Sequence, residues 1–448
     1  MARVNLLEGK ESSVIVKLAT PMVLGLLSVI GVSLVDAYFV GKIGTNELVA
    51  FGFIFPVMFT FNGVILGIGS GASTRVAKAV GSGNILQAKR ILTDALLLGV
   101  SLVIVLSVIG KLTIDPVFTM LGATHETLPL IRDFMHIWYS GAVLVTFPMI
   151  SVAVLVAIGN TQVSSRLQMS VMLGNIIFDP IFAFGFLFIP AMGFCGIAVA
   201  MLISRIFVLF YALYVLIKKE KMVTFERLTI GRLLLSWKDI LYIGLPNAGT
   251  NIIMPVGFGI ITRMAAGFGK EAVAAIAVAE RVETIAQIIL LALANSMGAF
   301  VGQNSGAGNV QRIRTGTRKV MQFSFYWGGI MLVGLYFFAD RLILLFNTDP
   351  KVIEIFTSYF HIMAFGYVMV GNIFIVQSIL NAFIMPFHAS MLMITRIFIL
   401  YVPFAIMLSS VMGINGIFCA GLIANVLTGF VSIIVFRRQS KKVFSAMQ

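Results

Sequence analysis

The sequence has few charged residues and very little cysteine. Of its 448 residues, 11% are charged and 59% are hydrophobic, whereas soluble domains contain about 25% charged and about 45–50% apolar residues. Because a soluble protein must cover its surface with polar groups, this composition excludes a set of soluble domains. Two cysteines exclude a disulfide scaffold and a four-cysteine zinc site. The composition therefore predicts an integral membrane protein.

The sequence also lacks the motifs of common enzymes. It contains no Walker motif, so the chain does not encode ATP hydrolysis. The four histidines lie in different segments, without the spacing of metal ligands and without a Ser/His/Asp arrangement. We therefore predict a protein that is not an enzyme and needs no cofactor or metal, and any transport by it must draw its energy from an ion gradient or from a partner.

Long apolar segments predict twelve membrane-spanning helices, since a helix needs about 20 apolar residues to cross the hydrocarbon core. The first six segments are Val14–Val40, Phe51–Ala72, Ile91–Ile114, Ile131–Ile158, Leu167–Ile189 and Gly193–Ile217. The other six are Ile240–Phe268, Val273–Val301, Val320–Phe346, Val352–Phe383, Met391–Val411 and Gly413–Phe436. The residues before the first segment are polar and do not resemble a cleavable signal peptide.

The charged residues are mostly basic and are unevenly distributed. The formal net charge is +14, and most of the 32 lysines and arginines lie at the two ends of the chain or in loops after even-numbered spans. Basic loops remain in the cytoplasm, so both termini are predicted to be cytoplasmic. The positive charge is thereby assigned to topology and to contact with anionic membrane lipid, and nucleic acid is not expected as a partner.

The two halves of the chain form an internal repeat. One offset of the sequence along itself aligns Pro21 with Pro246 and Asn84 with Asn309, and a slightly shorter offset aligns MGFCGI with MGINGI. Six spans per half give both halves the same orientation, related by an axis along the membrane normal. The predicted domains are an N-terminal six-helix bundle (1–217), a cytoplasmic linker (218–239) and a C-terminal six-helix bundle (240–448), around a central cleft.

Polar residues within the spans mark a candidate site. Asp36 lies near the end of the first span, with Ser33 close by on the same helix face. Asn175 and Asp179 share one face of the fifth span, and Pro180 frees a backbone carbonyl one turn earlier. An acid at a helix centre costs at least about 2.5–3.5 kcal/mol, and low dielectric favours its neutral form. These acids are therefore candidates to carry a proton or to bind a cation.

The predicted spans place the two acids at different depths. Asp36 is four residues from the end of its span, whereas Asp179 is near the middle of its own. At about 1.5 Å per residue, the two acids would lie roughly 9 Å apart along the membrane normal. Either the first span continues further outward, or the acids meet through helix tilt or water.

Aromatic and polar residues elsewhere in the first half are weaker candidates. His136, Trp138 and Tyr139 lie near the outer end of the fourth span, where they form either an interfacial aromatic belt or part of a pocket. Asn62 in the second span is a candidate of the same kind.

The second half has different intramembrane charges. Its eighth span contains AERVE, in which Glu280, Arg281 and Glu283 are predicted to neutralise one another. Arg205 and Arg396 are predicted to extend towards a polar edge of the membrane rather than to bind a ligand. The repeat aligns Asp36 with Ile261 and Asp179 with Ile399, so the second half lacks these acids and ion coupling is expected in the first half.

Several motifs, in order along residues 14–436, resemble the multidrug and toxic compound extrusion (MATE) family. They are LATPMVLGLL, VDAYFVGKIG, GSGASTRVAKAVGSGN, GNIIFDPIFAFGF and MGFCGIAVAMLISR in the first half, and GLPNAGTNIIMP and MGAFVGQNSGAGN in the second. The acid in the first helix and the Asn-x-x-x-Asp pair in the fifth are similar to the DNA-damage-inducible-F branch.

The resemblance implies an all-α integral membrane protein, with twelve transmembrane helices in two pseudo-symmetric six-helix bundles that form a V-shaped cleft. It implies a monomer in the bacterial inner membrane that exports amphipathic or cationic small molecules in antiport with protons or sodium. On this resemblance, the cation site contains Asp36, Asn175, Asp179 and Tyr139, and the first helix bends at Pro21. Candidates for the substrate pocket are Ser33, Asn62, His136 and Met201.

The scarcity of acids in the second half favours protons over sodium as the coupling ion. Relatives in the other large bacterial branch usually carry acids in helices seven and ten, whereas here helix seven has none and helix ten has only Glu354 near its start. A sodium-coupled drug antiporter and a flippase for a lipid-linked saccharide stay open as alternatives. A passive channel and a membrane enzyme are further alternatives, disfavoured by the asymmetric acids and by the lack of a catalytic cluster.

Overall fold

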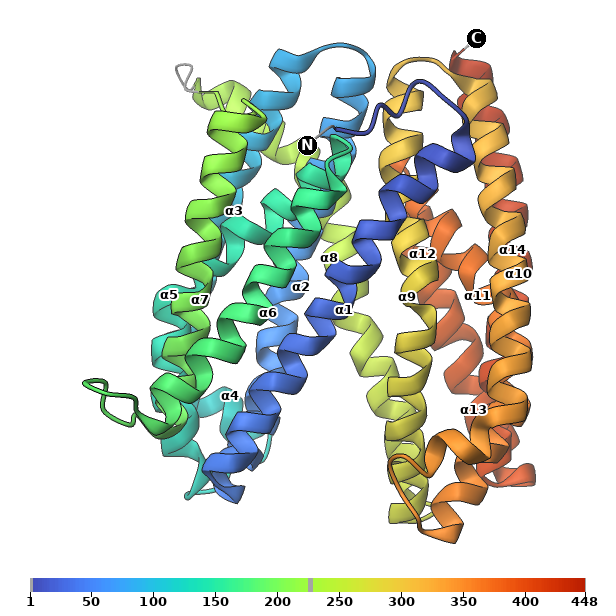
Figure 1. The fold of residues 1–448 in the computed structure, drawn as a ribbon. Helices are drawn as coiled ribbons and strands as arrows, with labels where there is room; N and C mark the ends of the chain where they lie inside the picture. Colours follow the sequence, from blue (N-terminus) through green and yellow to red (C-terminus); the bar gives the residue numbers. More distant parts are fainter. Residues whose placement is uncertain (1–2, 225–228, 448) are drawn as a thin grey trace. The chain divides into compact units, whose positions relative to one another are not determined.

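The chain is built from long helices. The computed structural model describes residues 3–224 and 229–447. In the first half the helices are α1 (Glu11–Ile43), α2 (Thr45–Gly81), α3 (Ile85–Leu112), the short α4 (Ile114–Met120), α5 (Thr127–Ala157), α6 (Thr161–Phe184) and α7 (Gly193–Tyr214), continued by the π-helix η1 (Val215–Lys219). In the second half they are α8 (Ile230–Ala266), α9 (Lys270–Gly306), α10 (Val310–Ile343), α11 (Pro350–Ala382), α12 (Pro386–Ile394), the π-helix η2 (Thr395–Tyr401), α13 (Val402–Met412) and α14 (Ile414–Met447). Figure 1 shows their order along the chain.

Each of the twelve predicted spans coincides with a long helix. Within the described residues, 11 helices are long and apolar enough to cross a membrane, and α12, η2 and α13 count together as one of them. The twelfth, α8, has 37 residues but carries Asn247, Thr250 and Asn251 near its centre. Several helices extend beyond the apolar segment, since α2 and α9 continue to Gly81 and Gly306 on the predicted cytoplasmic side.

The helix boundaries repeat with the spacing found in the sequence. Helices α2 and α9 have 37 residues each, and their first residues, Thr45 and Lys270, are separated by the same offset as Pro21 and Pro246. Helices α3 and α10 keep this offset, because they begin directly after Asn84 and Asn309. The register of the two halves is therefore set by the same turn residues in both.

Glycines explain the second repeated motif, MGFCGI and MGINGI. Gly193, the first residue of α7, and Gly413, directly before α14, have φ values of 56° and 61°, a left-handed conformation that favours glycine. A Cβ on Gly196 would lie 2.2 Å from the backbone oxygen of Phe182, and one on Gly416 would lie 2.2 Å from that of Leu408. The motif thus lets each helix begin in direct contact with the end of the preceding one.

The chain forms two compact units. The first contains Thr20–Ala248 and the described residues before Asn5, and the second contains Asn5–Ala19 and the described residues from Gly249 onward. Each unit has its own hydrophobic core. The chain thus passes from the first unit to the second inside α8, after Ala248. The sequence instead predicted a linker at 218–239 and a second bundle that begins at residue 240.

Close packing on α2 explains why the first part of α8 belongs to the first unit. A Cβ on Gly67 would lie 2.5 Å from the backbone oxygen of Gly244, and one on Gly71 would lie 2.3 Å from that of Ile240. Just beyond this contact, Arg75 forms an ion pair of 3.1 Å with Asp239. The glycines of α2 therefore hold α8 within backbone contact.

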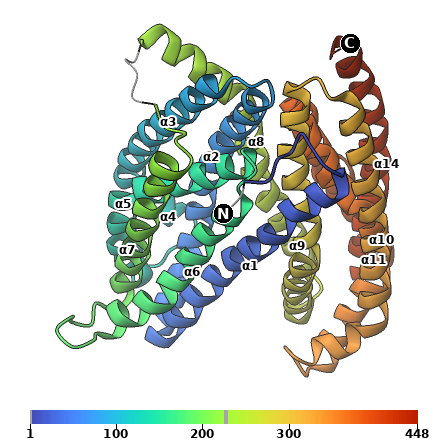
Figure 2. The same ribbon diagram turned by 45° about the horizontal axis from the view of Figure 1, so that its top comes forward.

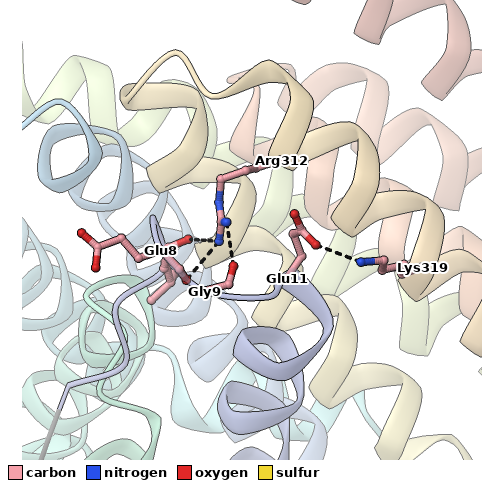
Figure 3. Close-up of polar contacts among 6 residues, drawn as sticks. Glu8, Gly9, Glu11, Arg312 and Lys319 are labelled. Carbon is pink, nitrogen blue, oxygen red and sulfur yellow. Dashed lines mark hydrogen bonds and ion pairs between the residues drawn. The ribbon is translucent and has the colours of Figure 1, made fainter.

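The segment before α1 is fixed within the second unit (Figure 3). Arg312 donates hydrogen bonds to the backbone oxygens of Leu6, Glu8 and Gly9 over 3.3, 3.2 and 2.8 Å. Lys319 forms an ion pair of 2.9 Å with Glu11 at the start of α1. Helix α1 thus belongs to the second unit up to Ala19 and to the first unit from Thr20 onward.

Within the first unit, α1 and α6 lie side by side, as Figure 1 and the turned view in Figure 2 both show. Two glycines of α1 permit this approach. A Cβ on Gly25 would lie 2.7 Å from the side chain of Gln168, and one on Gly31 would lie 2.5 Å from the sulfur of Met172. Small residues at a helix interface commonly allow such close contact in membranes, and here they bring the polar residues of the two helices together.

Candidate functional site

The structure brings three of the predicted site residues into one buried cluster in the first unit. Nδ2 of Asn175 on α6 donates a hydrogen bond of 2.7 Å to Oδ1 of Asp36 on α1. Asp36 is 4% exposed, and Asn175 and Asp179 are fully buried. The carboxyl groups of Asp36 and Asp179 are close enough to interact. The two acids therefore meet despite the roughly 9 Å that the predicted span ends gave, and α1 continues further outward, as one of the two predicted explanations requires.

The predicted depths were wrong because the span boundaries differed from the helix ends. Helix α1 continues to Ile43, and α6 covers Thr161–Phe184 rather than Leu167–Ile189. Asp36 is thus seven residues from the end of its helix, and Asp179 lies five residues from the end of α6 rather than near its middle. The longer α1 and the earlier end of α6 place the two acids at a similar depth.

The cluster contains more hydrogen-bond acceptors than donors. Both carboxyl oxygens of Asp179 and Oδ1 of Asn175 are buried, and none of them has a hydrogen-bond partner among the described residues. Buried acceptors nearly always find a partner, and two carboxylates at short range repel each other. A proton on one acid supplies a donor and removes a negative charge, so the arrangement is suited to binding a proton or a small cation.

Arg205 on α7 is a member of this site that the sequence interpretation missed. Its Nη1 donates a hydrogen bond of 2.8 Å to the backbone oxygen of Met201, and its charge interacts with Asp36 and Asp179. The neighbouring Ser204 packs on α6 where a Cβ on Gly174 would lie 2.8 Å from it. The guanidinium therefore lies near the acid pair, rather than at a distant polar edge. No local sequence signal indicates this placement, because the contact between Ser204 and Gly174 joins two different helices.

Tyr139 and Ser33 make other contacts than those predicted. The phenol ring of Tyr139 packs against Gly110 of α3 and Phe61 of α2, and no contact with Asp36 is observed among the described residues. The hydroxyl of Ser33 donates to the backbone oxygen of Ile30 over 2.9 Å, so its hydrogen goes to its own helix and not to the acid. The structure therefore does not bring these two residues into the acid cluster.

The remaining predicted pocket residues lie in three different environments. His136 is exposed. Asn62 is half-buried, and its Oδ1 is buried without a partner in the part of the chain that the structure describes. Met201 is 1% exposed, and its carbonyl holds Arg205. Of these three residues, Met201 is thereby the one connected to the acid cluster.

A groove of about 300 Å³ runs between α6 and α7 beside the cluster. It is lined by Gly174, Ser204 and the rings of Phe178 and Phe207, which stack with their centroids 5.6 Å apart. The groove is mostly apolar, as expected for a surface that faces lipid or an apolar ligand. It does not include the predicted pocket residues.

Pro21 lies within an uninterrupted α1. Its carbonyl accepts a hydrogen bond of 2.5 Å from Oγ of Ser165 on α6. Proline cannot donate to the preceding turn, so α1 has a weak point at the boundary between its two parts. The structure has one conformation of this helix, and bending at Pro21 stays a prediction.

The second unit contains a separate buried polar cluster that the sequence interpretation missed. Glu283 accepts hydrogen bonds from Tyr359 over 2.7 Å and from Gln287 over 2.5 Å. Arg396 is 8% exposed and donates through Nε to Asn425 over 2.8 Å. A small cavity of about 20 Å³, enough for one water molecule, lies among these side chains.

This cluster corrects two expectations for the second half. Arg281 is exposed, and it forms no ion pair with Glu280 or Glu283 within the described ranges, 3–224 and 229–447. Neutral donors from α9 and α11 satisfy Glu283 instead, because the helix turns Arg281 away from the bundle interior. Arg396 is buried and does not extend to a polar edge.

Two repeats of six helices, with buried charges inside them, define a multi-pass membrane transporter of the class built from internal repeats. The family model described as MatE matches residues 21–181 and again 246–407. The two matches begin at Pro21 and Pro246, the pair that the repeat aligns in the sequence, which confirms the internal repeat. The chain belongs to the MATE family. Members of this family are membrane transporters of small molecules, so the prediction of a transporter rather than an enzyme is confirmed.

Relatives and solved structures support this assignment over nearly the whole chain. A FAD transporter from Shewanella oneidensis is 34% identical over 427 residues, covering 95% of this chain and 94% of that protein. A probable multidrug resistance protein from Bacillus subtilis, YoeA, is 23% identical over 84% of this chain and 82% of that protein. The crystal structure of the Vibrio cholerae MATE transporter VcmN in the bent form superposes with a TM-score of 0.90 at 25% identity, covering 98% of each chain. The likeness confirms the all-α architecture of twelve transmembrane helices.

Proposed function

We propose that the protein is a proton-coupled exporter of amphipathic small molecules and that Asp36 is its main coupling group. The observation that carries the proposal is the buried acid cluster, in which Asp36 and Asp179 share one site and Asp179 has no hydrogen-bond donor among the described residues. The excess of acceptors fits a group that gains and loses a proton. Asn175 stabilises the charged form of Asp36, because its amide donates to that carboxylate.

The proposed cycle follows from where the acids lie. Protons reach the cluster from the outer side and neutralise Asp36, which weakens its attraction for the amide of Asn175. Helix α1 then bends at Pro21, where the proline leaves one helix hydrogen bond unmade, and the substrate is released outward. Loss of the proton to the cytoplasm restores the bond and allows substrate to bind again.

The remaining features of the proposal concern location and partners. The basic loops favour a cytoplasmic location for both termini, the bacterial relatives support the bacterial cytoplasmic (inner) membrane, and a monomer is the proposed state. The energy source is the proton gradient, with no cofactor. Amphipathic and often cationic compounds are the proposed substrates, as the names of multidrug relatives suggest.

Substitution of the coupling acid tests this proposal. In proteoliposomes with an imposed pH gradient, D36N should lose most proton-driven transport of a cationic dye, because an amide cannot carry the proton. D133N is the matched control, since Asp133 is an exposed aspartate on α5 of the same unit and should leave transport unchanged. Full proton-driven transport by D36N would contradict the assignment of Asp36.

A second candidate substrate is a flavin dinucleotide. It is favoured by the relative named as a FAD transporter, which matches 95% of this chain. Arg205 and Arg396 supply positive charges inside the two units that suit phosphate groups. The same proteoliposomes would decide between the candidates, since FAD export should be driven by the pH gradient and should compete with the dye if both use one site.

A further inference from the structure

The connection between α6 and α7 is an apolar hairpin. Its residues, 185–192, have the sequence GFLFIPAM, and no charged residue or histidine lies between Asp179 and Arg205. Phe186 and Ile189 pair through two backbone hydrogen bonds of 3.1 and 3.0 Å. Figures 1 and 2 both show this connection extending away from the ends of the two helices. The hairpin is therefore an element of its own rather than a tight turn.

The side chains at the tip of the hairpin are large, apolar and exposed. Phe186, Leu187 and Phe188 are 58%, 82% and 99% exposed, which is unfavourable in water. The exposed apolar surface continues onto α6 through Phe184 and towards α7 through Met192. Contiguous apolar patches mark sites that contact a protein or a membrane. Because this patch is continuous with two membrane-spanning helices, the partner that it fits is lipid.

The corresponding residues of the second half do not form a hairpin. The offset that aligns MGFCGI with MGINGI places residues 185–192 on 405–412, which belong to α13. In the first half, Gly185 ends α6 with a φ of 84°, and Pro190 cannot continue a helix. The hairpin is thus a feature of the first unit that the shared scaffold does not require.

The backbone of the tip indicates how deep it can lie. Leu187 has a φ of 52°, a conformation for which hairpin turns favour glycine, asparagine or aspartate, so turn geometry does not account for a leucine here. The amides of Leu187 and Phe188 have no backbone partner among the described residues, and unpaired amides are costly in the hydrocarbon core. The tip is therefore suited to the boundary between headgroups and acyl chains, where its side chains meet lipid and its amides meet water or headgroup oxygens.

We infer that residues 185–192 form a membrane anchor that inserts Leu187 and Phe188 into the lipid surface opposite to the termini. Five membrane-spanning helices precede the hairpin, so this surface is the outer leaflet in the predicted orientation. Helix α6 ends five residues after Asp179, and the anchor thereby sets the depth of the acid cluster in the membrane. The anchor requires neither a particular coupling ion nor a particular substrate.

The test is fluorescence quenching by brominated phosphatidylcholine in proteoliposomes. A nitrobenzoxadiazole fluorophore is attached to F188C in a protein that carries C195S and C419S. H125C is the matched control, because His125 is exposed in the connection between α4 and α5, on the same side of the membrane. We expect at least about threefold more quenching at position 188, since an interfacial anchor is buried about 5–10 Å into the boundary of the acyl chains. Equally weak quenching at both positions would overturn the inference.

A variant with a polar tip separates the side chains from the hairpin itself. L187N combined with F188G creates the Asn-Gly pair that two-residue hairpin turns favour, and an unchanged melting temperature in detergent shows that the variant is folded. With the fluorophore on F186C, the polar tip should lower quenching to the level of H125C, and unchanged quenching would refute the role of Leu187 and Phe188. If the hairpin instead contacts a second copy of the chain, F188C should form disulfide-linked dimers without quenching by brominated lipid, which would also overturn the inference.

Discussion

At the scale of single residues, the charged form of Asp36 depends on one amide donor. Asn175 donates to it over 2.7 Å in a fully buried position. We expect N175A to destabilise the protein by about 1–3 kcal/mol where Asp36 is ionised, and to have less effect at low pH, because the protonated acid does not need that donor. Thermal unfolding in detergent at several pH values would measure this difference. N62A is the control, since Asn62 makes no bond to an acid among the described residues, and equal destabilisation of N175A at all pH values would contradict the expectation.

The residues of the acid cluster differ in how readily a sequence indicates them. Asp36, Asn175 and Asp179 could be predicted, because acids and amides inside apolar helices are rare and costly. Arg205 could not, since its role depends on the contact between Ser204 and Gly174, which joins two helices and has no local signal. The placement of Tyr139 likewise depended on packing, here against Gly110 of α3.

At the scale of helices, two repeated glycines set the contact between neighbouring elements. Gly196 and Gly416 occupy the same place in the two halves, and each faces a backbone oxygen that would lie 2.2 Å from a Cβ. We expect G196A and G416A each to destabilise the protein by about 1–3 kcal/mol, because a backbone carbonyl cannot move aside as a side chain can.

The matched control for both glycines is G52A. Gly52 lies in α2 with no described atom within 4 Å of the position of a Cβ, so alanine there should leave stability unchanged or raise it slightly through better helix propensity. Thermal stability by fluorescence-detected size exclusion would compare the three variants. Equal melting temperatures for G52A and G196A would show that the contact at Phe182 is looser than the structure indicates.

At the scale of the whole molecule, composition and long apolar segments were sufficient to predict the number of membrane-spanning helices, and turn residues were sufficient to predict the repeat. The offset that aligns Pro21 with Pro246 appears again in the starts of α2 and α9 and in the two matches to the family model. The division into units could not be predicted, since it depends on Gly67 and Gly71 holding the first part of α8. Hydropathy indicates which residues avoid water but does not indicate which helix they touch.

The orientation of the whole chain in the membrane can be tested with two engineered cysteines. Both native cysteines, Cys195 and Cys419, are half-buried and free, so serine is first introduced at these positions. Ser82 and His125 lie in the loops after α2 and α4, on opposite sides of the predicted membrane, and both are exposed. Because the first of these loops is flanked by more basic residues than the second, an impermeant maleimide should label H125C in intact spheroplasts and S82C only after permeabilisation. Labelling with the opposite accessibility would place both termini outside the cell and reverse the direction of the proposed transport cycle.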